Sequence, residues 1–170
     1  MSDIIVTSDG FIKYGGLRFR CALGKGGVKP EADKREGDGA TPLGRYALRH
    51  VWYRPDRVTA PQTRLPVQAL TPQDGWCDDP ADPAYNRHVL LPYTASHEKL
   101  WREDHVYDVI VVLGHNDDPP VPGMGSAIFL HLARPDYSGT EGCVALALPD
   151  LLALLAVLPP QSAMLIVKAE

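Results

Sequence analysis

Glycine and proline recur along this whole sequence, and they constrain its fold more than any other feature. The chain has 15 glycines and 16 prolines among its 170 residues. Both residue types favour turns, and proline inside a helix removes a backbone hydrogen bond. We therefore expect many turns and a β-rich fold rather than a helical bundle.

Alternating and continuous apolar segments predict the strands. Leu17, Phe19 and Cys21 alternate with Arg18 and Arg20, which predicts a half-buried strand. The segment "YDVIVVLGHN" contains the continuous apolar run "VIVVL", which indicates a strand buried on both faces. The expected strands cover residues 3–7, 17–23, 46–54, 107–116, 126–133, 143–148 and 162–170.

Helices and loops fill the remaining segments. Pro149 is well suited to open a helix over residues 149–158, and Ser96 is a suitable N-cap for a helix over residues 96–104. Residues 24–45 are rich in glycine and are expected to form a long loop. A second polar loop over residues 74–86 carries Trp76 and Tyr85, which either line a groove or belong to the core beneath the loop.

Length and charge limit the classes of function. A chain of 170 residues predicts one domain, spanning residues 1–170. The net charge is −4 and no basic run occurs, so no nucleic-acid partner is expected. The longest apolar run, residues 151–158, is too short for a membrane span and indicates a core helix. The first residues lack the pattern of a secretory signal, which leaves three options open: the cytosol, another export route, or a signal already removed.

The cysteines raise the question of nucleophilic chemistry. The chain has three cysteines, Cys21, Cys77 and Cys143, so at least one must be a free thiol. None belongs to a C-x-x-C pair. Cys143 follows Gly142 and comes shortly after His131, which closes an apolar run. A neighbouring imidazole can take the proton of a thiol and leave a nucleophilic thiolate. Cys143 is therefore either a buried packing residue or a nucleophile with His131 as its base.

Two blocks of sequence resemble the YkuD-type L,D-transpeptidases, which act on bacterial peptidoglycan through a cysteine. "IFLH" followed by "TEGCV" is similar to the family's histidine and S/T-x-G-C signature, here at His131, Thr140, Gly142 and Cys143. The segment "KREGDGATPLGRY" resembles the D-G-x-T-P-x-G-x-Y pattern of the family. It matches at Asp38, Gly39, Thr41, Pro42, Gly44 and Tyr46.

The resemblance implies a mostly β YkuD-type fold, a mixed β-sandwich or partly closed barrel with one or two short helices. It implies a cysteine acyl-enzyme with His131 as base, the Leu132 carbonyl orienting the imidazole, and the amides of Gly142 and Cys143 holding the oxyanion. The acyl group would pass to an amine, giving 3-3 or 1-3 cross-links or D-amino acid exchange, or to water, giving L,D-carboxypeptidase activity. The remaining site residues are expected to bind substrate: His115, Thr140, Glu141, Arg134, Tyr137 and Trp76.

The resemblance also implies partners and conditions. The substrate is a peptidoglycan stem peptide containing diaminopimelate, the compartment is the periplasm or cell envelope, and the protein is expected to be a monomer. No cofactor and no metal is expected, and carbapenems and thiol reagents should inactivate the enzyme.

Two departures from the family pattern keep alternatives open. Glu141 stands where many members have histidine, and Ala145 stands where many have arginine or asparagine, so Arg134, Arg35 or Lys34 would bind the substrate carboxylates instead. A non-catalytic wall-binding module is the first alternative. A zinc-dependent peptidase is the second, with ligands drawn from His115, Asp117, Asp118 and His131.

Overall fold

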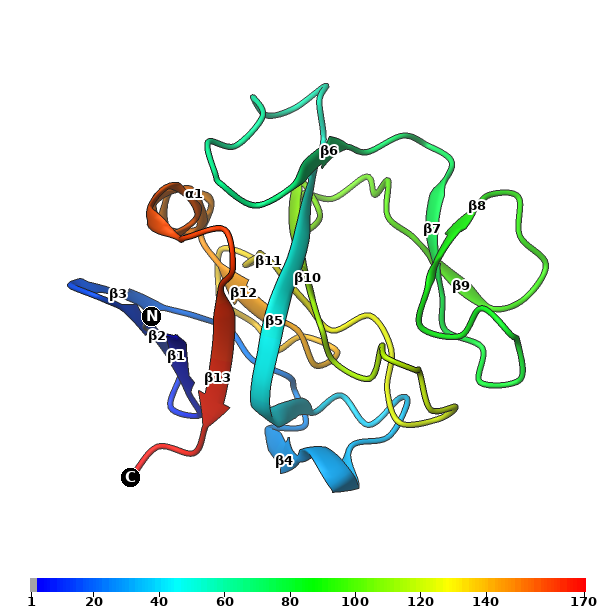
Figure 1. The fold of residues 1–170 in the computed structure, drawn as a ribbon, viewed down its shortest axis with the longest axis horizontal. Coiled ribbons are helices and arrows are strands. Elements are labelled where there is room, and N and C mark those ends of the chain that lie inside the picture. Colours follow the sequence, from blue (N-terminus) through cyan, green and yellow to red (C-terminus); the bar gives the residue numbers. More distant parts are fainter. Residues whose placement is uncertain (1–2) are drawn as a thin grey trace.

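The structure is a computed structural model that describes residues 3–170, and strands dominate it (Figure 1). A large sheet has the strand order β12-β11-β10-β5-β13-β1-β2-β3, with β4 and β6 added to β5. A separate three-stranded sheet has the order β8-β7-β9 and lies on the opposite side of β5 from β1–β3 (Figure 1). The mostly β architecture expected from the sequence is therefore confirmed.

The bounds of the elements are as follows. The large sheet contains β1 (Ile4–Thr7), β2 (Phe11–Tyr14), β3 (Leu17–Arg20), β4 (Val28–Pro30), β5 (Thr41–Tyr53), β6 (Val67–Ala69), β10 (Val109–Leu113), β11 (Phe129–Leu132), β12 (Val144–Leu146) and β13 (Ala163–Val167). The small sheet contains β7 (Asp74–Cys77), β8 (His88–Leu90) and β9 (His97–Lys99). The helices are the short 3-10 turn η1 (Glu31–Asp33) and α1 (Leu148–Val157).

The two ends of the large sheet meet, so the sheet curls into a nearly closed barrel. Just beyond β3, the Ala22 N–H donates to the Ala145 carbonyl at 2.8 Å, and the Ala145 N–H donates back to Ala22 at 2.9 Å. This antiparallel bridge joins the residues that follow β3, at one edge of the sheet, to β12, at the other edge. Closure removes exposed strand edges and fixes β12, next to which Cys143 lies.

Strand β5 is the longest element and carries most of the pairing. It pairs antiparallel with β10 and β13 and parallel with β4 and β6. It begins at Thr41, whereas the sequence predicted a loop over residues 24–45. The difference arises at Gly44, whose φ of 138° is tolerated inside a strand and whose missing side chain leaves room for the Tyr46 hydroxyl.

The core has two parts, separated by the faces of β10, β11 and β12. Leu130 and Leu132 face one cluster together with the buried leucines of α1. Phe129 and Cys143 face the other cluster, which contains Trp52 and Trp76. All five residues of β10 are buried, as the continuous apolar run predicted, and the helix opened by Pro149 is confirmed as α1.

The prediction of a helix over residues 96–104 is wrong. Residues His97–Lys99 form β9, which pairs antiparallel with β7, and bends and turns follow. A nine-residue helix is marginal by itself, so pairing with a neighbouring strand decides the conformation. The same pairing makes a strand of Asp74–Cys77, where a polar loop was expected.

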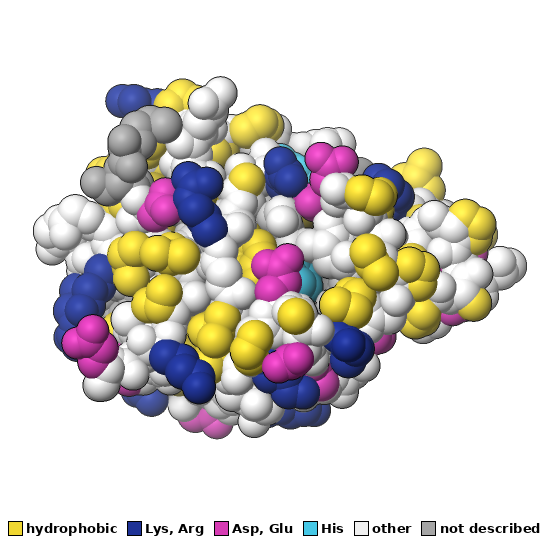
Figure 2. Space-filling view, turned by 60° about the horizontal axis from the view of Figure 1, so that its bottom comes forward, with side chains coloured by type: hydrophobic (Ala, Val, Ile, Leu, Met, Phe, Trp, Pro, Cys, Tyr) yellow, Lys and Arg dark blue, Asp and Glu magenta, His cyan; other side chains and the backbone are white. Residues whose placement is uncertain are grey.

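The surface seen in Figure 2 shows positive and negative side chains interspersed with apolar ones rather than segregated into a patch of one sign. Within residues 3–170, no helix is both long and apolar enough to cross a membrane.

Candidate active site

The parallel pairing of β11 and β12 brings Cys143 and His131 to the same face of the sheet. His131 pairs with Ala145, and Leu130 pairs with Val144, so Cys143 stands two residues before the partner of His131. Residues two apart in a strand point to the same side, and diagonal neighbours across two strands are close. Both side chains line one cavity of about 500 Å³.

The thiol of Cys143 is buried and hydrogen-bonded to the backbone. The residue is 5% exposed, Sγ accepts from the Phe129 N–H at 3.3 Å, and the S–H donates to the Ala127 carbonyl at 3.2 Å. Burial raises the pKa of the thiol to about 12. At neutral pH the resting cysteine is therefore a thiol and not a thiolate.

The imidazole of His131 is held in one orientation. Its Nδ1 lies 3.0 Å from the Leu132 carbonyl, the partner expected from the sequence, and the ring of Tyr107 approaches edge-on with ring centroids 5.3 Å apart. A carbonyl can only accept, so Nδ1 carries the hydrogen and Nε2 is left with a free lone pair. Burial lowers the pKa of His131 to about 4, which keeps the ring neutral and able to accept a proton.

A tight turn positions the cysteine. The Thr140 hydroxyl donates to the Cys143 carbonyl at 2.7 Å and accepts from the Gly142 N–H at 3.1 Å. Gly142 has a φ of 125°, and a Cβ there would lie 2.7 Å from the Ala40 carbonyl. Thr140 and Gly142 therefore fix the turn, and the Gly142 amide, expected to bind the oxyanion, is already engaged. Within residues 3–170 the Cys143 amide has no acceptor.

Arg134 and Glu141 line the cavity with the cysteine and histidine, as does Thr140. Arg134 lies 3.7 Å from Asp104. Glu141 is mostly exposed and forms an ion pair with Lys25 at 2.6 Å. All three therefore lie at the cavity that holds Cys143 and His131, and their contact with substrate stays a prediction.

Trp76 and Tyr137 lie elsewhere, which corrects their expected place at the substrate. Trp76 is buried in the core, where its ring meets Phe129 edge-on and its Nε1–H donates to Asn86 at 3.0 Å. The ring of Tyr137 is covered by the guanidinium of Arg20 at 4.3 Å and does not line the cavity.

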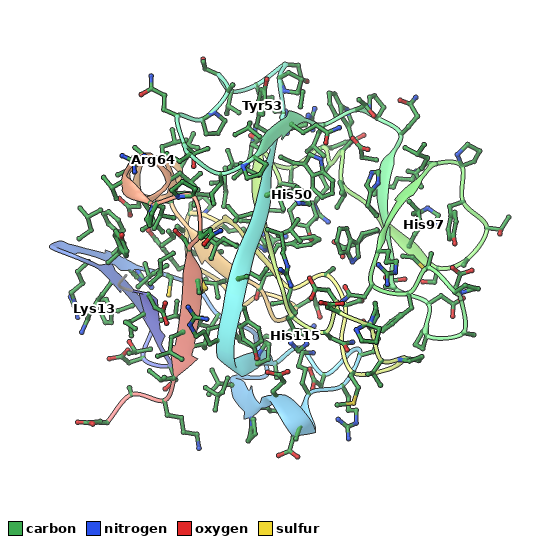
Figure 3. All side chains as sticks on the ribbon, viewed as in Figure 1. Lys13, His50, Tyr53, Arg64, His97 and His115 are labelled. Carbon is green, nitrogen blue, oxygen red and sulfur yellow. The ribbon has the colours of Figure 1, made fainter. Side chains whose placement is uncertain are left out.

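His115 is also a core residue and does not line the cavity. Its ring lies edge-on to Tyr46, with centroids 5.3 Å apart, and both ring nitrogens are buried with no hydrogen-bond partner among residues 3–170. Figure 3 shows it beside the start of β5, at the opposite end of the strand from Tyr53, while His97 lies on the separate small sheet. Across residues 3–170, no group of three or more His, Cys, Asp or Glu side chains is arranged to hold a metal ion, so the zinc alternative has no ligand set there.

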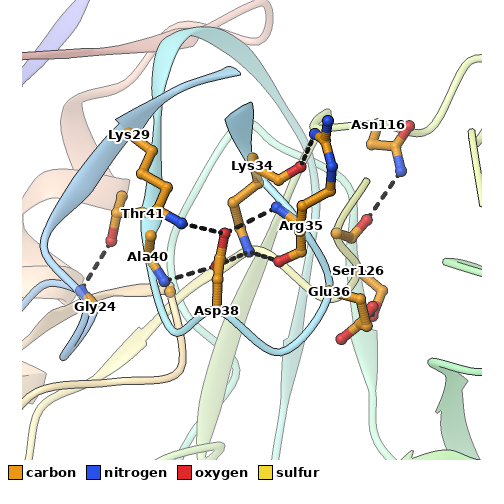
Figure 4. A network of polar contacts seen from close by, with 12 residues as sticks. Gly24, Lys29, Lys34, Arg35, Glu36, Asp38, Ala40, Thr41, Asn116 and Ser126 are labelled. Atoms are coloured by element: carbon orange, nitrogen blue, oxygen red, sulfur yellow. Dashed lines mark hydrogen bonds and ion pairs between the residues drawn. The ribbon is translucent and has the colours of Figure 1, made fainter. Parts of the chain in front are cut away.

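A buried ion pair forms another wall of the cavity. Lys34 is buried, and its Nζ donates to Asp38 Oδ1 at 2.6 Å and to the Arg35 carbonyl at 2.8 Å (Figure 4). The other carboxylate oxygen of Asp38 accepts from the Arg35 N–H at 2.8 Å, and the amide of Ala40 donates to Oδ1 at 2.9 Å. These donors hold the pKa of Asp38 well below its usual range despite partial burial.

The cavity also contains residues that the sequence did not point to, among them Glu98, Arg102 and Tyr107. Tyr107 donates its hydroxyl hydrogen to Glu98 Oε1, and its ring contacts His131. Tyr107 lies just before β10, whose five residues are all buried, and this position next to a buried strand was the signal that could have identified it. Glu98 lies within the segment wrongly expected to be helical.

A comparison with protein families shows which family the chain belongs to. The chain matches the family model for the L,D-transpeptidase catalytic domain, YkuD, over residues 6–167. The chain belongs to the YkuD family. No curated protein matches the sequence. As a YkuD domain the chain is placed among proteins that act on peptidoglycan in the cell envelope, and the match spans both blocks on which the resemblance was based.

Proposed function

We propose that this YkuD domain is an L,D-transpeptidase that acts on peptidoglycan stem peptides through a thioester at Cys143. The observation that carries the proposal is the shared cavity: a thiol and a neutral, oriented imidazole lie on one face of β11 and β12 within a space of about 500 Å³. A volume of this size accommodates a short peptide segment.

His131 acts as a general base because its resting state is neutral. The thiol hydrogen, which donates to the Ala127 carbonyl at rest, turns about the Cβ–Sγ bond toward Nε2 when substrate binds. His131 takes this proton as sulfur attacks the carbonyl of the third stem residue, and then gives it to the leaving amine of D-alanine. The Leu132 carbonyl stabilises the imidazolium that exists between these two steps.

The amide of Cys143 is the donor we assign to the oxyanion. It has no acceptor among residues 3–170, whereas the Gly142 amide is bonded to Thr140. A free amide adjacent to the nucleophile stabilises negative charge that develops on the attacked carbonyl oxygen. The turn at Gly142 holds this amide in place.

Arg134 is the side chain we assign to the substrate carboxylates. It lines the cavity and shares Asp104 with Arg102, so two guanidinium groups face a single carboxylate. Lys34 also lines the cavity but is bound to Asp38, and Arg35 does not line it. Arg134 thus replaces the arginine or asparagine that the family pattern has at the position of Ala145.

The thioester then passes to an amine of a second stem, forming a cross-link, or to water. We further propose that the chain acts as one domain, as a monomer, and in the periplasm or cell envelope.

Turnover of muropeptides tests the proposal. Replacing Cys143 with Ala should abolish both the release of D-alanine and the appearance of dimers, because no other side chain in the cavity can form the thioester. The matched control is Cys77→Ala, a buried free cysteine outside the cavity, which should retain activity. Dimers formed by Cys143→Ala at the wild-type rate would contradict the proposal and favour another nucleophile. Binding of muropeptides without turnover by the wild type would favour a non-catalytic wall-binding module.

A further inference from the structure

The cations that line the cavity are already paired with acids of the protein. Lys34 Nζ lies 2.6 Å from Asp38. Arg102 lies 2.7 Å from Asp104, and Arg134 lies 3.7 Å from the same carboxylate. Each lysine and arginine that lines the cavity thus already has a carboxylate partner from the protein.

The acids that line the cavity are not balanced in the same way. Glu141 is paired with Lys25. Glu36, Asp78 and Glu98 also line the cavity, and within residues 3–170 none of them has a cationic partner within 4.0 Å. This part of the cavity therefore favours a positively charged ligand.

Of these three acids, Glu98 is the one joined to the catalytic side chains. One of its oxygens accepts the hydroxyl hydrogen of Tyr107, and the Tyr107 ring contacts His131. Glu36 is exposed and its Oε1 accepts from Tyr85 and Ser126. The other Glu98 oxygen has no hydrogen-bond partner among the described residues and belongs to a side chain that lines the cavity with Cys143.

We propose that Glu98 binds the acyl acceptor as an ammonium ion and thereby directs the thioester toward an amine rather than water. The proposal rests on the proposed function and adds a specificity-determining residue to it. The acceptor class is a primary amine of a second stem peptide, which is protonated in solution at neutral pH. Burial raises the pKa of Glu98, and an ammonium ion bound beside it favours the ionised carboxylate; the resulting ion pair holds the amine near His131.

The reaction balances with these groups alone. The bound ammonium ion gives one proton to neutral His131, and the resulting amine attacks the thioester carbonyl. A carbon–nitrogen bond forms and the carbon–sulfur bond breaks. The nitrogen then loses a second proton, which passes to the departing sulfur and restores the Cys143 thiol. The proton held by His131 passes to solvent, so one proton is released for each ammonium ion consumed.

The test is the partition of the acyl-enzyme in a Glu98→Gln variant. Glutamine keeps an oxygen that accepts from Tyr107 but removes the charge. The donor is a tetrapeptide stem, and the two acceptors are a tripeptide stem, which is an ammonium ion at pH 7.5, and hydroxylamine, which is uncharged there. Mass spectrometry measures the ratio of amide or hydroxamate to hydrolysis product. Glu103→Gln is the matched control, since Glu103 is exposed and does not line the cavity.

The expected result is specific to the charged acceptor. In Glu98→Gln the ratio of tripeptide transfer to hydrolysis should fall about tenfold relative to the ratio of hydroxylamine transfer to hydrolysis measured in the same variant. Glu103→Gln should match the wild type. An unchanged tripeptide ratio in Glu98→Gln would overturn the inference and leave the proposed function intact.

A second outcome would also overturn the inference. An equal fall in transfer to both acceptors would mean that Glu98 acts by holding Tyr107 against His131 and not by attracting charge. If the wild type forms no thioester from the donor, the proposed function itself fails, which is a separate result.

Discussion

At the scale of single residues, burial sets the chemistry of Cys143 and His131 in opposite directions. The pKa of the thiol rises to about 12 and that of the imidazole falls to about 4, so both groups are neutral at rest. The sequence suggested that an imidazole can leave a thiolate–imidazolium pair. Both residues are buried, which the sequence does not disclose, and burial favours the neutral pair instead.

The neutral pair predicts how Cys143 reacts with iodoacetamide. The thiolate is the reactive form, so the alkylation rate should rise steadily from pH 7 to pH 10, about tenfold for each pH unit. Peptide mapping by mass spectrometry measures the rate at Cys143 separately from Cys21 and Cys77. A rate that is already constant between pH 6 and pH 8 would show a stable thiolate–imidazolium pair and contradict this assignment.

At the scale of elements, the segment between β4 and β5 is held by one carboxylate. Asp38 receives the ammonium group of Lys34 and the backbone N–H groups of Arg35 and Ala40, and this arrangement gives the cavity one of its walls. The Lys34 side chain is 3% exposed, so its charge depends on Asp38 for compensation.

Replacing Asp38 with Ala should lower the free energy of unfolding by ~3–5 kcal/mol, because a buried ammonium group loses its partner. Urea denaturation measures this change. Asp33→Ala is the control, since Asp33 is exposed in η1 and has no ion pair among the described residues. The double variant Lys34→Met with Asp38→Ala should recover much of the loss. Equal stability of Asp38→Ala and wild type would contradict this account of the wall.

The strands show where sequence patterns suffice and where they fail. The continuous apolar run of β10 and the histidine-ended run of β11 were predictable because burial on both faces requires uninterrupted apolar residues. Strand β9 was not predictable, because its three residues are held by pairing with β7 and not by their own pattern. Glu98 therefore could not be placed in the cavity from the sequence.

The candidate site was predictable only in part, for a related reason. Cys143, His131 and the Leu132 carbonyl follow from one motif on two adjacent strands. His115 and Trp76 were misplaced because histidine and aromatic side chains occur both in cores and in grooves. The side toward which each ring points depends on the barrel, and the barrel is closed by the distant bridge between Ala22 and Ala145.

At the scale of the whole molecule, the buried histidines couple stability to pH. His131 binds a proton less readily in the folded protein, where its pKa is about 4, than in the unfolded chain. The unfolded state therefore binds more protons between pH 6.5 and pH 4, and stability falls as pH falls through this window. Burial also lowers the pKa of His115, which adds to the same trend.

The free energy of unfolding should decrease by up to ~3 kcal/mol between pH 6.5 and pH 4 on account of His131. Urea denaturation at a series of pH values measures the slope. His131→Gln should show a shallower slope over this range, because glutamine does not titrate. The assignment of a buried neutral His131 fails if wild type and His131→Gln have the same pH dependence.

The central claim is that Cys143 forms a thioester with the stem peptide with His131 as its base, and intact-protein mass spectrometry tests it most directly. The wild type mixed with a tetrapeptide stem and quenched in acid should gain the mass of the stem minus D-alanine, mapped to the peptide that contains Cys143. His131→Gln should form this adduct far more slowly, and Cys143→Ala should not form it. A wild type that releases D-alanine with no adduct on Cys143, or an adduct that persists in Cys143→Ala, would contradict the account.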